Sequence, residues 1–175
     1  MYTNNYTFSS VNAIKIILNN SENKILLIQE PGNNNWMPLH WGLPGGKPTE
    51  TESLLETFYR KVKSDIGQEV ELKGLVKIQE LLMKGRTVLM YIVLAVAKSG
   101  EVMGEGANYR WVSKDEIEKM KVSDFTEFYN KELILDYFNK KLTLIPISVL
   151  NTLEYYKYDN NKDYQDWLES GKVTK

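Results

Sequence analysis

The sequence contains no cysteine among its 175 residues and only one histidine, His40. The lack of cysteine excludes disulfides, thiolate catalysis and zinc sites built on cysteine. The net charge of −1 provides no general field that would attract nucleic acid or an acidic membrane. We therefore expect no nucleic-acid duplex as a partner, although a local basic patch is compatible with these numbers.

Long apolar runs are also missing. No stretch approaches the roughly 20 apolar residues of a membrane span, so we expect no membrane partner. The first ten residues, MYTNNYTFSS, lack the basic and apolar regions of a secretory signal. A composition of 42% hydrophobic and 26% charged residues is typical of a globular chain. These features predict a cytoplasmic protein with a sizeable core.

Several β-branched and apolar runs are separated by turn signals and therefore predict strands. The predicted pieces are a hairpin of 11–18 with 24–29, a larger hairpin of 69–83 with 86–98, and a short strand at 109–112. Residues 30–40 are expected to form a loop, and Trp41-Gly42-Leu43 a short strand before the Pro44-Gly45-Gly46 turn.

Capping signals and helical spacing predict the helices. Thr49 and Glu52 form a Thr-x-x-Glu capping box at the start of one helix, which Gly67 would end. Ser113 and Glu116 open a second, short helix. A third is predicted over 124–140, with an apolar face, and a last one over 163–170. The core candidates of the third helix are Phe125, Phe128, Leu133, Leu135 and Phe138.

The order of these elements indicates an α+β fold, with helices layered on a mixed β-sheet. We expect residues 1–140 to form the domain. Residues 141–175 are rich in aromatic side chains and are too few for an independent domain, so they are expected to pack on it as a C-terminal extension.

One stretch, residues 43–68 with the sequence LPGGKPTETESLLETFYRKVKSDIGQ, resembles the signature of the Nudix hydrolases. That signature is Gly, five residues, Glu, seven residues, Arg-Glu-aliphatic, one residue, Glu-Glu, one residue, Gly, aliphatic. The spacing holds without insertion. The matching positions are Gly46, Glu52, Arg60, Val62 and Gly67. The resemblance covers residues 9–140 and implies the Nudix fold, an α/β/α sandwich with a mixed β-sheet.

The resemblance also implies a function. Nudix enzymes cleave a nucleoside diphosphate linked to another group and use Mg²⁺ or Mn²⁺, and dimers are common among them. The expected partners are thus a nucleotide-type small molecule and a second copy of the chain. In the family Glu52 and Arg60 are mainly structural, and we expect Arg60 to be buried and paired with Glu52.

The acids that hold the metal in the family are mostly replaced. The three positions on one helix face are Lys61, Ser64 and Asp65. Protonated lysine cannot ligate Mg²⁺, and serine is a weaker ligand than a carboxylate. Asp65, Glu105 and the carbonyl of Gly45 would form a reduced site for one metal ion.

A local similarity to GDP-mannose mannosyl hydrolases extends this interpretation, because they also lack most of these acids. Their metal-binding amide falls at Glu105 and their histidine base at Gly106, which cannot act as a base. His40 lies in a loop before the glycine turn, and we expect it to be a loop residue rather than a base. No general base is identified.

Two functions remain open at this stage. The first is a divergent, metal-dependent Nudix hydrolase in which Lys47 and Lys61 contact phosphate and Trp36 stacks on a nucleobase. The second is a catalytically impaired Nudix-fold module that binds a nucleotide or a protein. Lys61 is central to the choice: it could bind phosphate directly, or it could pair with Asp65 at i+4 and block the metal.

Overall fold

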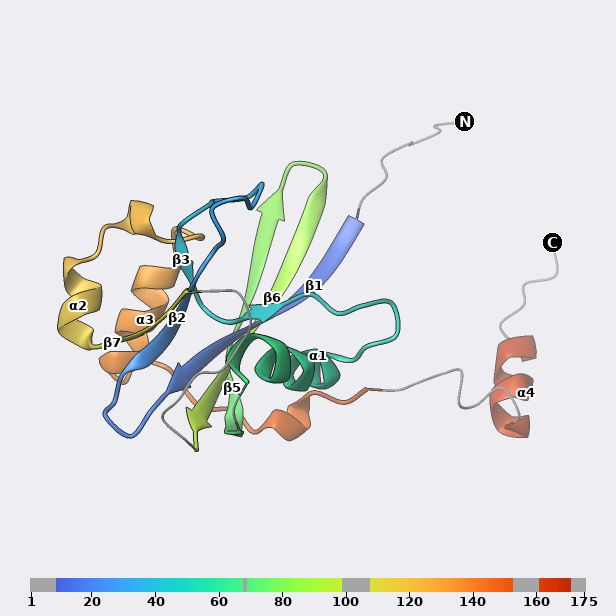
Figure 1. Cartoon of the computed structure of the whole chain (residues 1–175). Helices are drawn as coiled ribbons and strands as arrows, with labels where there is room; N and C mark the ends of the chain where they lie inside the picture. Colours follow the sequence, from blue (N-terminus) through green and yellow to red (C-terminus); the bar gives the residue numbers. More distant parts are fainter. Residues whose placement is uncertain (1–8, 68, 99–107, 153–160, 171–175) are drawn as a thin grey trace.

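The computed structural model describes residues 9–67, 69–98, 108–152 and 161–170 (Figure 1). Its main element is a mixed β-sheet whose strands run in the order β3-β2-β1-β6-β5, with β4 paired to β1 and β7 paired to β2. The strands are β1 (Ser9–Asn19), β2 (Ile25–Gln29), β3 (Trp41–Gly42), β4 (Gly45–Gly46), β5 (Val70–Met83), β6 (Arg86–Ala97) and β7 (Asn108–Val112). Both predicted hairpins and the short strand near residue 110 are confirmed.

The sheet is mixed because its two long central strands run parallel. β1 pairs with β6 in parallel from Ser9↔Arg86 to Asn19↔Val96, whereas every other strand pairing is antiparallel. A strand exposes alternate residues to opposite faces, and both faces of β1 are apolar. The strand therefore contributes to two separate cores at once.

Helices cover both faces, which confirms the α+β fold with its α/β/α layering. On one face, α1 (Leu54–Lys61) and the π-helix η1 (Val62–Ile66) bury Phe58 and Ile66 against β1 and β6. On the other face, α2 (Lys114–Lys119) and α3 (Asn130–Phe138) bury Ile117, Leu133 and Ile134. Figure 1 shows α1 on one side of the sheet and α2 with α3 on the other.

The first helix begins later than the sequence predicts. Its N-cap is Ser53, whose side chain accepts from the backbone N–H of Glu56 while Glu56 accepts from that of Ser53. Thr49 and Glu52 form the same kind of contact one turn earlier, since the N–H of Thr49 donates to Glu52 at 3.0 Å. Two overlapping capping patterns precede the helix, and only the second opens it. The predicted stop is confirmed, because Gly67 ends the helix with a φ of 69°.

The third predicted helix is also shorter than expected. A 3₁₀ turn, η2 (Val122–Asp124), and a loop occupy the start of that stretch, and α3 begins only at Asn130. Phe125 is buried, as predicted, but Phe128 is exposed and the prediction of a core position for it is wrong. Phe128 lies in this loop and not in the helix, so helical spacing does not direct its side chain into the core.

The C-terminal extension begins on the edge strand β5. Ile145 forms two backbone hydrogen bonds with Leu75, of 2.7 and 2.9 Å, in an antiparallel bridge. The 3₁₀ turn η3 (Ile147–Val149) follows, and Ile147 packs on the α1 side of the sheet. The last helix, α4 (Lys162–Ser170), lies apart from the sheet in Figure 1. Packing of the whole extension on the domain stays a prediction.

The helices of the described ranges are all too short or too polar to cross a bilayer.

Candidate functional site

A cleft of about 210 Å³ lies where the end of β2, the β3–β4 turn and η1 meet. It contains both charged groups and backbone of the glycine turn, so several of the predicted site residues come together in it. The lining residues are Lys15, Ile28, Gln29, Glu30, Pro31, Gly42, Leu43, Pro44, Gly45, Lys61, Asp65 and Tyr109.

Gly45 is required by close packing on β1, and Gly46 lies against the Lys61 side chain. Gly45 has a φ of 150°, and a Cβ there would lie 2.1 Å from the carbonyl oxygen of Ile14. A Cβ on Gly46 would lie 3.0 Å from Cε of Lys61. Gly45 thus lets the turn pair with β1. Gly46 leaves room for the Lys61 side chain to pass the turn and reach the cleft.

Lys61 and Asp65 form a close ion pair in the cleft. The Lys61 ammonium lies 2.8 Å from Oδ1 and 2.7 Å from Oδ2 of Asp65, and the Ser64 hydroxyl donates to Oδ1 at 2.7 Å. The two side chains keep only 21% and 23% of their surface exposed. Both carboxylate oxygens therefore already have donors from the chain itself.

The π-helical turn carries this arrangement. The N–H of Gly67 donates to the carbonyl of Val62, five residues earlier, at 2.9 Å. π-turns within α-helices are rare and occur often at functional sites. Here the turn contains Ser64 and Asp65, while Lys61 is the last residue of α1. The sequence gives no signal for the π-turn, because its residues also fit an ordinary α-helix.

The described residues around Asp65 do not fit a divalent cation. A hard cation such as Mg²⁺ takes several oxygen ligands, but the oxygens of Asp65 are held by an ammonium of the same charge sign as the metal. The described part of the chain holds no group of three or more histidine and acidic side chains placed to bind a metal. Glu105, the second predicted ligand, and Gly106 lie outside the described residues.

Arg60 and Glu52 brace the glycine turn, as the resemblance implies. Arg60 Nη2 donates to Glu52 Oε2 at 2.8 Å and to the backbone carbonyl of Lys47 at 3.0 Å. The expectation that Arg60 is buried is wrong, since 39% of its side chain is exposed. The guanidinium bonds to the carbonyl of Lys47 on the turn and to Glu52, so it contacts the turn and not the core.

This brace gives an expected pH dependence. Hydrogen bonds from Arg60, and then from the Thr49 backbone, lower the pKa of Glu52 to about 2. Below the ordinary carboxyl pKa the unfolded chain binds more protons, so this contribution to stability is full above about pH 4.5 and is lost as pH falls toward 2. We expect Glu52→Gln to flatten the fall in urea midpoint between pH 4.5 and 2.5. An unchanged slope would show that the brace does not contribute.

The remaining predicted ligand contacts do not line the cleft. Lys47 is exposed and contributes its backbone carbonyl to Arg60. Trp36 is exposed on the loop after β2, where its backbone N–H donates to Oδ1 of Asn34. His40 Nδ1 donates to the carbonyl of Pro38 at 2.7 Å, and His40 borders a separate hollow of about 230 Å³. The roles predicted for Lys47 and Trp36 stay predictions.

Sequence reasoning missed a second ion pair beside the cleft. Lys15 projects from the middle of β1 and lies 3.0 Å from Oε1 of Glu127, with 16% and 22% of the two side chains exposed. Burial alone would raise the pKa of Glu127, but Lys15 and the hydrogen bonds from Thr126 and Asn130 outweigh it and lower that pKa. No motif joins residues 112 positions apart, so only the fold reveals this pair.

Tyr109 also enters the cleft from β7. Its hydroxyl is buried and has no hydrogen-bond partner in the structure as described. Burial, and then the charge of Asp65, raises the pKa of this hydroxyl, so it stays protonated at neutral pH. A buried hydroxyl usually finds a partner. Tyr109, which lines the cleft, therefore holds a donor that has no partner among the described residues.

Comparison with known proteins agrees with this geometry. The NUDIX domain profile matches residues 10–132. A NUDIX hydrolase from Nitrosomonas europaea superposes with a TM-score of 0.68 at 20% identity, over 83% of this chain and 98% of that one. The MutT protein from Methanosarcina mazei Go1 gives 0.57 at 21% identity, over 75% and 94%.

A third solved structure, a UDP-X diphosphatase, gives a TM-score of 0.57 at 13% identity, over 76% of this chain and 64% of that one. No curated protein matches the sequence. At these identities the superpositions establish the fold alone. The NUDIX profile, however, spans most of the sequence, with the glycine turn, the Arg60–Glu52 brace and the cleft inside it. The chain therefore belongs to the Nudix hydrolase family.

Proposed function

We propose that the cleft binds a nucleoside diphosphate derivative, and that the Lys61 ammonium takes the place of the metal charge used by Nudix hydrolases. Hydrolysis is then much slower than in enzymes with the full set of acids. One observation carries this proposal: Lys61 Nζ lies within 2.8 Å of both oxygens of Asp65.

The chemistry of Lys61 supports a binding role. A lysine ammonium has three donors, and Asp65 accepts from it at two oxygens, which leaves one N–H for a phosphate oxygen. Lys61 and Lys15 both line the cleft, each beside its own carboxylate. Because these pairs cancel most of the charge, we expect modest affinity with only a weak salt dependence.

Tyr109 provides a test of the ligand's position. Tyr109→Phe removes the free hydroxyl of the cleft and retains the ring. We expect ligand affinity to fall about fivefold, which corresponds to one hydrogen bond of about 1 kcal/mol. Thermal stability should not fall, since the hydroxyl has no partner in the described chain. Calorimetric titration and thermal unfolding measure the two effects, and unchanged affinity would place the ligand elsewhere.

The proposed function is tested with a panel of nucleoside diphosphate sugars, dinucleoside polyphosphates and ADP-ribose. Each compound is added with EDTA and, separately, with Mn²⁺. We expect thermal stabilisation by at least one compound in EDTA, and turnover with Mn²⁺ close to background. Rapid metal-dependent turnover would contradict the proposal, and so would an absence of stabilisation throughout the panel.

The second candidate is metal-dependent hydrolysis, with Asp65, Glu105 and the Gly45 carbonyl holding Mg²⁺ or Mn²⁺. Its support is the position of Gly45 and Asp65 on the same cleft. Full turnover in the panel that is lost in Asp65→Asn would favour it. The predicted cytoplasmic location and homodimer remain predictions, and sedimentation measures the second.

A further inference from the structure

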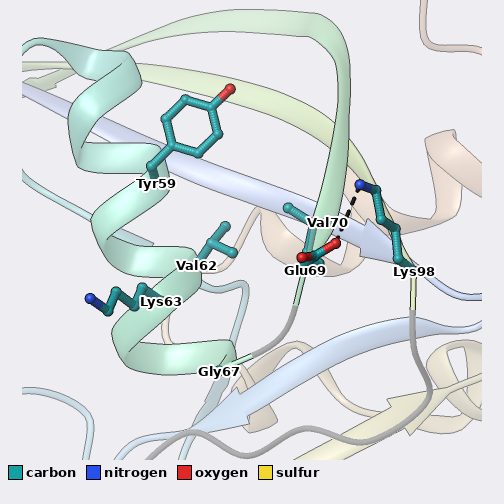
Figure 2. A pocket seen from close by; sticks show the side chains of 7 residues that line it. All are labelled: Tyr59, Val62, Lys63, Gly67, Glu69, Val70 and Lys98. Atoms are coloured by element: carbon teal, nitrogen blue, oxygen red, sulfur yellow. Dashed lines mark hydrogen bonds and ion pairs between the residues drawn. The ribbon is translucent and has the colours of Figure 1, made fainter.

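A second, larger hollow lies on the α1 side of the sheet, away from the cleft. It is an open groove of about 520 Å³ between the end of the α1–η1 helix and the first residues of β5. Figure 2 shows Tyr59 and Val62 on its helix side and Val70 on its strand side. Tyr59 is 59% exposed although it is aromatic. The groove thus has an apolar surface with no partner in the described structure.

Basic groups rim this groove. Lys63 and Lys98 line it together with one acid, Glu69, so these three give a net charge of +1. Lys98 Nζ lies 3.5 Å from Oε2 of Glu69, which is a long separation for an ion pair (Figure 2). An exposed pair this long contributes little, which leaves Lys98 available to another acid. The groove therefore fits an apolar partner that carries negative charge.

The start of the C-terminal extension runs toward the groove. The bridge between Ile145 and Leu75 is antiparallel, so the chain after Ile145 follows β5 backward, in the direction of Val70. Gly74 makes room for this contact, because a Cβ there would lie 2.5 Å from the carbonyl of Ile145. Ile147 then joins the same apolar cluster as Val70.

The sequence of α4 matches the groove in pattern and charge. In the sequence, Tyr164, Trp167 and Leu168 follow the i, i+3, i+4 spacing that is typical of an amphipathic helix. The helix carries three acids, Asp163, Asp166 and Glu169, against one lysine, Lys162, so its net charge is −2. An amphipathic helix with this pattern needs a surface for its apolar stripe.

We propose that the groove between α1–η1 and β5 is the docking site for α4 of the same chain. Eleven residues lie between Leu150 and Lys162, and the twelve Cα-to-Cα steps of this connection span about 40 Å when fully extended. A connection of this length lets α4 reach any surface within about 40 Å of Leu150. Docking covers Tyr59 and brings the acids of α4 next to Lys98.

The absence of native cysteine allows a clean crosslinking test in the full chain. Lys63→Cys on the groove is combined with Asp163→Cys beside the apolar stripe, and a short bismaleimide reagent is added at low protein concentration. We expect an intramolecular product at least fivefold above a control pair, Asp163→Cys with Val122→Cys. Val122 is half-exposed on η2, next to the opposite face of the sheet.

Trp167→Ser in the same double-cysteine chain should reduce the product to the control level, and circular dichroism checks that each variant is folded. Equal yields from the two cysteine pairs would overturn the proposal. A covalent dimer as the main product would also overturn it, since α4 would then occupy the groove of a second copy.

Discussion

Lys61→Glu is expected to raise the affinity of the cleft for Mn²⁺ at least tenfold, or about 1.4 kcal/mol. The substitution removes the ammonium that holds both oxygens of Asp65. It also adds a carboxylate four residues before Asp65, on the same helix face. A higher ligand charge strengthens the binding of a hard cation. The scaffold around the site is unaltered, because Gly45, Gly46 and the Arg60–Glu52 brace stay in place.

Electron paramagnetic resonance of free Mn²⁺ measures this affinity directly. Lys63→Glu is the matched control, since it makes the same charge change two residues away on the exposed surface. We expect little change in that variant. Equal gains in the two variants would mean that general charge, rather than the release of Asp65, governs metal binding. No gain in either variant would show that the cleft has lost the geometry of a metal site.

Lys15→Met is expected to lower the free energy of unfolding by about 3 kcal/mol, because it leaves Glu127 charged, largely buried and without its cation. The double variant Lys15→Met with Glu127→Gln should recover most of this loss. The neutral amide oxygen can still accept from Asn130, whose Nδ2 lies 2.7 Å from Oε2 of Glu127. Replacing a buried ion pair by neutral groups is often close to neutral in stability.

Urea unfolding of the two single variants and the double variant gives the coupling between Lys15 and Glu127. Lys24→Met is the control, since the pair between Lys24 and Glu22 is exposed, and we expect no measurable change there. If Lys15→Met were as stable as the unchanged chain, the pair would be unimportant for holding the 125–130 loop against β1.

The fold and part of the site could be predicted from the sequence because they depend on local spacing. The glycine pair, Glu52, Arg60 and Gly67 lie within one short segment, and their fixed intervals predicted both the turn and its brace. The same spacing placed Lys61 and Asp65 on one helix face. It could not decide between phosphate binding and pairing, because i+4 spacing is compatible with both. The structure shows the pairing, with distances of 2.7 and 2.8 Å, and phosphate binding by the remaining N–H of Lys61 is part of the proposed function.

The parts that were missed depend on contacts between distant segments or on competing local signals. The Lys15–Glu127 pair and the Tyr109 hydroxyl reach the cleft from separate strands and loops, which no spacing rule connects. The start of α1 was misplaced because Thr49 and Ser53 each offer a cap. Glu105, on which the predicted metal site depended, lies outside the described residues.

The most direct test of the central claim is anomalous scattering from crystals soaked in Mn²⁺, recorded for the unchanged chain and for Lys61→Glu. If Lys61 holds Asp65 in place of a metal, the unchanged chain will show no anomalous peak beside Asp65, whereas the variant will show one. A strong peak next to Asp65 in the unchanged chain would contradict the account.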